Sequence, residues 1–261
     1  MTTTRLWTSS WLAAALVAAL AGLSLTAAPR AVFAVEAGSA YSDAELQAVM
    51  TDDEAKIADL RNQELSALRI TLGRRQPQHR MADLYFRLAE LYLEAYRAEF
   101  LLEGRVHERR RVEGKPAGFI NRARSKVFLL SGVKACNEIL NLRIAYNKLD
   151  RVYYFLGVNS LELEDRKEAL KNFEYLTRKF PSSPFVSDAY RELGDSEFEK
   201  KEFAKAQAYY EMAVKRETGD TLPRLLHKLA WTYYRTRQFD RAVETMKEAI
   251  SRTGRSGRAH V

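Results

Sequence analysis

The side chains that could carry catalytic or metal chemistry are few and scattered in this sequence of 261 residues. None of its four histidines has a second histidine or cysteine three or four residues away, the spacing that a metal site on a helix needs. These histidines are His79, His107, His227 and His260. Carboxylates are plentiful, but they occur in patterns such as ELEDRKEALK, where opposite charges solvate a helix face. The sequence also lacks a glycine-rich phosphate loop and a nucleophile elbow. It therefore predicts no enzyme, no cofactor and no metal site.

The only cysteine is Cys136, which lies in the apolar run FLLSGVKACNEIL. A thiol in such a run is typical of a buried structural residue rather than a reactive one. Because it has no partner in the chain, no intrachain disulfide can form. We therefore expect the fold to be stabilised by packing alone.

The first 34 residues have the order of a secretory signal peptide. Residues 1–10 carry one basic residue and no acidic one, residues 11–25 are apolar, and small residues follow. This apolar run is shorter than the roughly 20 residues that span a bilayer, so we expect cleavage rather than a retained anchor. Cleavage is expected after Ala34 or, as the second choice, after Ala40. No cysteine lies near either site to accept lipid. The sequence thus predicts an exported protein.

Cleavage after Ala34 would leave 40 basic and 34 acidic residues, because only Arg5 and Arg30 of the 42 basic residues would be removed. Residues 105–126 concentrate this positive charge, with eight basic and two acidic side chains. We call the eight the basic patch: Arg105, Arg109, Arg110, Arg111, Lys115, Arg122, Arg124 and Lys126. It is either a solvated helical tip or a docking surface for anionic lipid headgroups or an acidic partner. Export argues against nucleic acid as a partner.

Apolar residues recur at spacings of three and four, which predicts an all-α fold. Three segments align with one another, and they begin at Asp150, Ser187 and Pro223. Each has a small residue at its eighth place, an alanine at its twentieth and a large residue at its twenty-fourth. We expect two antiparallel helices to cross closely at the small residues, while the large residue fills the space beside them. The small residues are Gly157, Gly194, Ala230, Ala169, Ala206 and Ala242.

The seam after the first segment reads KFPSSPFVSD. Pro181 is expected to end one helix, because proline cannot continue it. Ser187 and Asp188 are then expected to cap the next helix. Abrupt stops and restarts of this kind mark the boundary between two helical hairpins.

This pattern resembles the tetratricopeptide repeat (TPR), a helical hairpin that stacks into a superhelix. The resemblance implies three repeats over 150–186, 187–222 and 223–254, with a flexible tail over 255–261. The longer spacing and the seam are similar to the repeats of bacterial envelope proteins that act in outer-membrane assembly, cell constriction and gliding motility. Upstream, we expect a linker and one helix over 43–72 within 35–80, ending at Gly73. Residues 81–149 should form a stretched, degenerate hairpin with a break near 114–118 and a second helix over about 119–140.

The resemblance also implies a partner-binding concave face, built from places two, five, nine, twelve and thirteen of each repeat. We call these residues the first-helix face: Arg151, Tyr154, Val158, Leu161, Glu162, Asp188, Arg191, Asp195, Phe198, Glu199, Arg224, His227, Trp231, Tyr234 and Arg235. Rings beside arginines are favoured at protein contacts, although some rings could instead be core residues. Val158 and Asp195 replace the asparagine that a terminal-carboxylate clamp requires, so that ligand is not expected.

These features predict a non-enzymatic periplasmic adaptor that binds envelope proteins through the first-helix face. The alternative is a structural subunit that self-associates into an envelope lattice. The last expected helix carries an apolar stripe: Ala242, Val243, Met246, Ala249 and Ile250. We expect the outer side of this stripe to be covered by a partner, a second copy or further repeats.

Overall fold

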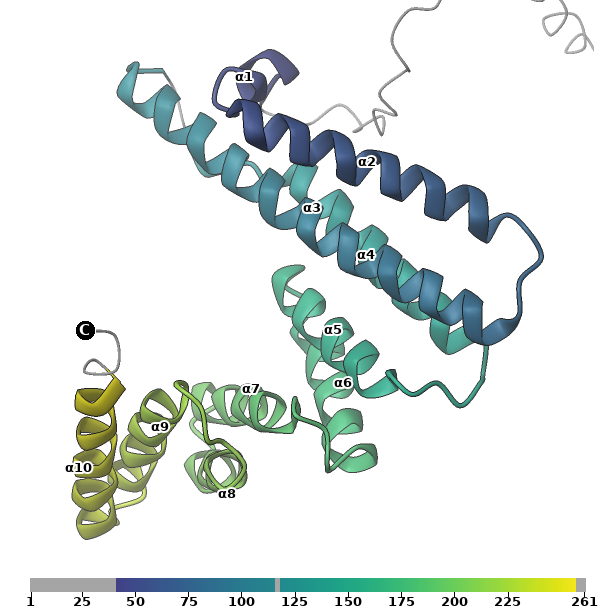
Figure 1. Cartoon of the computed structure of the whole chain (residues 1–261). Helices are drawn as coiled ribbons and strands as arrows, with labels where there is room; N and C mark the ends of the chain where they lie inside the picture. The colour runs from purple at the N-terminus through teal and green to yellow at the C-terminus, as the bar shows by residue number, and fades with distance from the viewer. Residues whose placement is uncertain (1–40, 116–117, 257–261) are drawn as a thin grey trace, which may run out of the picture. The chain divides into compact units, whose positions relative to one another are not determined.

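The computed structural model describes residues 41–115 and 118–256, so the expected signal peptide, its cleavage sites and the last residues of the tail lie outside the described part. Within that part the fold is all-α, as predicted, and it contains no strand. Figure 1 shows the helices in chain order. They are α1 (Asp43–Gln47), α2 (Asp52–Leu72), α3 (Gln78–Val112), α4 (Ala123–Asn141), α5 (Leu149–Glu162), α6 (Arg166–Lys179), α7 (Val186–Glu199), α8 (Phe203–Val214), α9 (Leu222–Arg235) and α10 (Phe239–Ser256).

The single helix expected over 43–72 is wrong, because two helices occupy this stretch. The Thr51 side chain accepts a hydrogen bond from the Glu54 amide, and the Glu54 carboxylate accepts one from the Thr51 amide. This capping box begins α2 and separates it from α1. Gly73 follows the last residue of α2, where the end was expected.

The long helix α3 packs along α4, and α2 lies beside α3. Their shared core includes Leu91, Ile139 and Cys136. Cys136 is buried, as predicted, and burial raises the pKa of its thiol to about 12. A thiol that stays protonated at neutral pH is a packing residue and not a nucleophile.

Helix α4 begins at Ala123 and not near Phe119, which is 99% exposed. The Asn121 side chain accepts from the Ala123 amide at 2.9 Å. The buried Glu103 carboxylate of α3 accepts from the Arg124 and Ser125 amides at 3.0 and 3.2 Å. These acceptors satisfy the free amides of the first turn and so fix where the helix starts. Burial raises the pKa of Glu103, whose carboxylate has no basic partner among the described contacts.

Three antiparallel pairs follow, α5 with α6, α7 with α8, and α9 with α10, and each pair also packs on its neighbour. Helix α6 ends at Lys179, and Pro181 lies exposed in the turn behind it. The cap expected from Ser187 is wrong, because α7 already begins at Val186. The Ser187 hydroxyl instead donates to the Ala213 carbonyl at 3.1 Å, which joins α7 to the end of α8.

The small residues occupy the close crossings that the alignment predicted. A Cβ atom on Gly157 would lie 2.7 Å from Cζ of Phe173, and one on Gly194 would lie 2.7 Å from Cε1 of Tyr210. Phe173 and Tyr210 are the residues at the twenty-fourth place, and both are buried. Ala230, at the eighth place of the third repeat, is also buried. The alanines at the twentieth place are buried as well, and these are Ala169, Ala206 and Ala242. The repeat register derived from the sequence is therefore correct at these positions.

The turn inside each hairpin has the same backbone form. Glu164, Lys201 and Arg237 stand at the fifteenth place and have positive φ angles of 66°, 64° and 62°. The amide of the following residue donates back to the helix, as Glu202 does to the Glu197 carbonyl at 2.9 Å. This is the Schellman arrangement, in which a left-handed residue ends a helix.

Candidate partner-binding surface

In the first repeat, most of the first-helix face packs against the repeat's own neighbours. The Tyr154 ring stacks on Phe185 at 4.6 Å, and its hydroxyl donates to Asp188 at 3.2 Å. Burial raises the pKa of Tyr154 to about 12. Val158 and Leu161 are half-buried against the same core, whereas Arg151 and Glu162 are exposed. This part of the face is mainly interhelical packing.

In the second repeat, the face is a charge network centred on Asp195. Its carboxylate accepts from Lys228 at 2.7 Å, from Tyr210 at 2.5 Å and from Arg191 at 3.3 Å. Burial, followed by the bond to Asp195, raises the pKa of Tyr210. Arg191 also contacts Asp188 at 3.5 Å. These polar groups satisfy one another and hold α7 to α8 and α9, so they offer little free hydrogen-bonding capacity to a ligand. Phe198 is half-buried, whereas Glu199 is exposed and pairs with Arg166.

The third repeat presents its face to solvent. Trp231 and Tyr234 are 45% and 53% exposed, and their ring centroids lie 5.8 Å apart. The Trp231 indole donates to the His227 ring at 3.1 Å, and Tyr234 contacts Phe239 at 5.7 Å. We call this continuous line of four rings the aromatic row. The other exposed members of the face here are Arg224 and Arg235.

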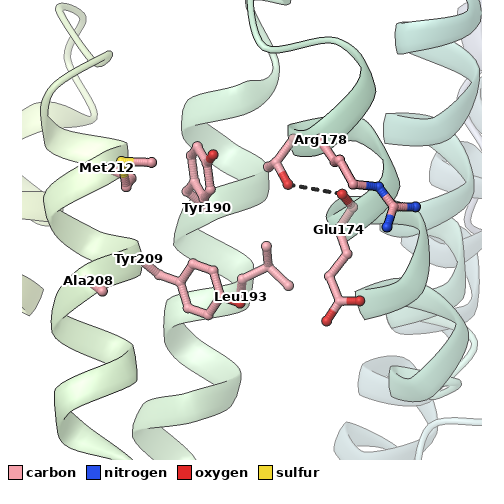
Figure 2. Close-up of a pocket in the computed structure, with 8 residues that line it drawn as sticks. Glu174, Arg178, Tyr190, Leu193, Ala208, Tyr209 and Met212 are labelled. Carbon is pink, nitrogen blue, oxygen red and sulfur yellow. Dashed lines mark hydrogen bonds between the residues drawn. The ribbon is translucent and has the colours of Figure 1, made fainter.

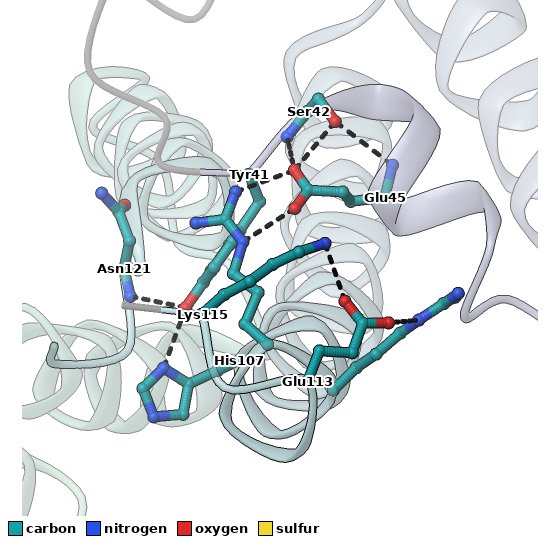
Figure 3. Close-up of polar contacts among 9 residues, drawn as sticks. Tyr41, Ser42, Glu45, His107, Glu113, Lys115 and Asn121 are labelled. Atoms are coloured by element: carbon teal, nitrogen blue, oxygen red, sulfur yellow. Dashed lines mark hydrogen bonds and ion pairs between the residues drawn. The ribbon is translucent and has the colours of Figure 1, made fainter. Parts of the chain in front are cut away.

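The basic patch is not a surface of unpaired positive charge, since each of its eight side chains has a carboxylate partner. Arg110 makes two bonds to Glu45, of 2.7 and 2.9 Å, and these bonds lower the pKa of Glu45 to about 2. Figure 3 shows this contact beside Ser42, Glu113 and Lys115. The remaining pairs are Arg105–Glu54, Arg109–Glu113, Arg111–Glu108, Lys115–Glu113, Arg122–Glu162, Arg124–Glu99 with Arg124–Asp43, and Lys126–Glu164. The solvated-tip interpretation fits these contacts better than lipid docking does.

Sequence reasoning missed a cleft of about 400 Å³ between the first two repeats (Figure 2). Tyr190 of α7 and Tyr209 and Met212 of α8 line it, with Glu174 and Arg178 of α6. The three-residue spacing of Tyr209 and Met212, which places both side chains on one face of α8, was the available signal.

The described residues hold no group of three or more histidine, cysteine or carboxylate side chains placed to bind a metal ion. None of their helices, including the long α3, combines the length and apolar character needed to span a bilayer. The arrangement that remains is a stack of hairpins with exposed rings and paired charges. Such a surface suits contact with another protein.

The folded hairpins define a helical repeat protein, and the comparisons identify the type of repeat. Residues 223–254, the third hairpin, match the tetratricopeptide repeat family model. The first two hairpins align with the third in sequence and share its crossings and turns. This chain therefore contains TPR-type repeats, which are the basis of a scaffold for protein–protein interaction.

Similar solved structures include the crystal structure of MamA, at 15% identity over 69% of this chain and 94% of that one, with a TM-score of 0.42. The apo form of RapI is 14% identical over 77% of this chain and 68% of that one, with a TM-score of 0.49. BtubC from P. vanneervenii is 13% identical over 80% of this chain and 93% of that one, with a TM-score of 0.46. A search of curated proteins found no match to the sequence.

Proposed function

We propose that this protein is a non-enzymatic adaptor of the bacterial periplasm that binds envelope proteins through the first-helix face of its third repeat. The observation that carries the proposal is the aromatic row, in which Trp231 and Tyr234 of α9 are exposed beside Arg224 and Arg235. Tryptophan and tyrosine bury a large area at small entropic cost, and they are frequent among residues that dominate binding energy.

The paired charges of the second repeat support the same location. Asp195 and Arg191 already bind each other and their neighbours, so a ligand would have to break these contacts. Trp231 and Tyr234 need no such rearrangement. We therefore place the contact at the third repeat and not across all three.

Export rests on the sequence of residues 1–34, and the assignment to the envelope rests on the resemblance of the repeats. Outer-membrane assembly, division and motility remain the three processes that the resemblance suggests. Fractionation of cells that produce the full chain tests this part. A shortened form in the periplasmic or outer-membrane fraction is expected, and an unshortened cytosolic form would contradict export.

Partner binding is tested by crosslinking in cells and affinity capture of the full chain, followed by mass spectrometry. The variant Trp231→Ala with Tyr234→Ala should lose the captured envelope protein by at least roughly tenfold, because each ring can contribute roughly 2 kcal/mol. Phe119→Ala is the matched control, since this ring is 99% exposed but lies outside the repeats. Equal loss in the control, or an unfolded double variant, would contradict the proposed surface.

A further inference from the structure

The cleft of about 400 Å³ between the first two repeats contains an exposed carboxylate, that of Glu174 on α6 (Figure 2). Helices α6 and α8 each pack on α7, and residues of all three helices line the cleft. Within the described part of the chain, no side chain makes a hydrogen bond or an ion pair with the Glu174 carboxylate. The cleft has the size of many ligand pockets, which measure roughly 300–1,000 Å³.

The contact between the second and third repeats shows what an equivalent carboxylate binds. Glu211 stands at the twenty-fifth place of the second repeat, as Glu174 does in the first. Its carboxylate accepts from the Arg241 guanidinium at 3.1 Å and from the Tyr233 hydroxyl at 2.8 Å. The Arg241 guanidinium also lies over the Tyr233 ring, 4.1 Å from its centroid. This carboxylate therefore holds a guanidinium that is stacked on a tyrosine.

The contact between the first and second repeats keeps the carboxylate but lacks both partners. In the second repeat, Glu197 stands at the place of Tyr233, and Lys205 stands at the place of Arg241. An acid thus replaces the hydroxyl donor, and a lysine replaces the arginine. Neither of the two contacts Glu174, so no described residue fills the guanidinium position beside this carboxylate.

The charges around this position leave the carboxylate of Glu174 without compensation. Two ion pairs near it are neutral, and they are Glu197–Lys200 and Lys205–Glu202, at 2.7 and 3.6 Å. The Arg178 guanidinium points away from Tyr209 in Figure 2 and lies over the Tyr175 ring at 5.9 Å. The position beside Glu174 therefore complements a positive charge.

Two tyrosine rings border the same position. The Arg216 guanidinium lies over the Tyr190 ring at 5.3 Å, so one ring of the cleft already holds a cation of this chain. The Tyr209 ring is 6.2 Å from the Tyr190 ring, and no cation of the described residues lies over it. Burial, and then the charges of Glu174 and Glu197, raise the pKa of Tyr209. A cation over Tyr209 would thus lie in the field of these carboxylates.

We propose that this cleft binds an arginine side chain of a partner protein, with its guanidinium bonded to Glu174 and stacked on Tyr209. Leu193 and Met212, which line the cleft, contact the aliphatic stem of the arginine. Arginine fits better than lysine, because its planar guanidinium makes parallel hydrogen bonds to a carboxylate and stacks on rings. The inference goes beyond the proposed adaptor surface, because it uses no residue of the first-helix face. It gives the scaffold a second contact, to a partner that exposes an arginine.

Solution NMR of the protein from cells that express the full chain, labelled at its methionine methyl groups, tests the proposal. The probe is the acetylated and amidated peptide Ala-Leu-Arg-Leu-Ala, and a second peptide carries citrulline, a neutral isostere, instead of arginine. The arginine peptide should shift the Met212 methyl signal in a saturable way, because this side chain lines the cleft. The citrulline peptide should bind at least roughly tenfold more weakly, because it lacks the charge-assisted hydrogen bonds. Long-range attraction does not favour the probe, since the chain has 42 basic and 34 acidic residues.

Glu174→Gln should weaken binding of the arginine peptide at least roughly tenfold. It should keep the wild-type melting temperature, because the exposed carboxylate has no partner to lose. Glu244→Gln, at an exposed carboxylate of α10 outside the cleft, is the matched control and should bind like the wild type.

Four results would each overturn the assignment. They are an unchanged Met212 signal with the arginine peptide, equal binding of the citrulline peptide, wild-type binding by Glu174→Gln, and a lower melting temperature of Glu174→Gln. The last result would show that the carboxylate already has a partner within the chain.

Discussion

Gly157→Ala isolates the close crossing of α5 and α6 with the smallest possible change. The added Cβ would lie 2.7 and 2.8 Å from Cζ and Cδ1 of the Phe173 ring, and this ring is fully buried. Overpacking of a core costs roughly 1–3 kcal/mol. The gain in helix propensity from glycine to alanine offsets about 1 kcal/mol of this. We expect a net loss of up to roughly 2 kcal/mol, which lowers the melting temperature by up to roughly 8 °C.

Gly104→Ala is the matched control, because a Cβ at this position in α3 has no atom within 4 Å. It should gain roughly 1 kcal/mol from helix propensity alone. The double variant Gly157→Ala with Phe173→Met tests the cause of the loss. The third repeat already combines Ala230 with Met246 at the same two places, so a flexible methionine should accommodate the alanine. Thermal melting of five proteins is the assay: the wild type, Gly157→Ala, Gly104→Ala, Phe173→Met and the double variant. Equal shifts for Gly157→Ala and Gly104→Ala, or no coupling with Phe173→Met, would refute the crossing model.

Three further substitutions test other contacts. Lys201→Gly should raise the melting temperature, because a left-handed non-glycine residue costs roughly 1 kcal/mol; no gain would mean that the turn is unstrained. Burial raises the pKa of the Glu103 carboxyl group above its ordinary value of 4.5. The contribution of this group to the free energy of unfolding is therefore fully present below pH 4.5 and is lost as pH rises through the folded pKa. The stability of Glu103→Gln relative to the wild type should therefore increase as pH rises above about 4.5, and parallel pH profiles from urea unfolding would exclude this. Asp195→Asn weakens the acceptor of Tyr210 and Lys228 and should cost roughly 1–3 kcal/mol in urea unfolding; an unchanged midpoint would show that the network adds nothing.

The repeat register could be predicted because its determinants lie close together in sequence. Gly157 and Phe173 are only 16 residues apart, and the same pair recurs as Gly194 and Tyr210. The break before α2 was also present in the sequence, as the capping-box pattern from Thr51 to Glu54, but periodicity alone concealed it.

The basic patch could not be interpreted in this way, because its carboxylate partners come from distant segments. Arg110 pairs with Glu45, 65 residues away, and Arg124 pairs with Asp43, 81 residues away. Only the fold brings these charges together. The same limit applies to Tyr154, whose burial depends on Phe185 in the next repeat.

The connection between the N-terminal helices and the first repeat has a consequence for how the chain opens. The Glu162 carboxylate, at the end of α5, accepts from Tyr96 of α3 at 2.7 Å and from Arg122 at 3.0 Å. At the other end, α10 packs mainly on α9. Stability in such arrays is a sum of local and nearest-neighbour terms, so local unfolding should begin at α10 and progress toward α5. Amide hydrogen exchange would then show graded protection, lowest in the last hairpin, which carries the aromatic row. The proposed partner-binding surface would thus lie on the segment that opens most easily, and binding there would slow exchange throughout that hairpin.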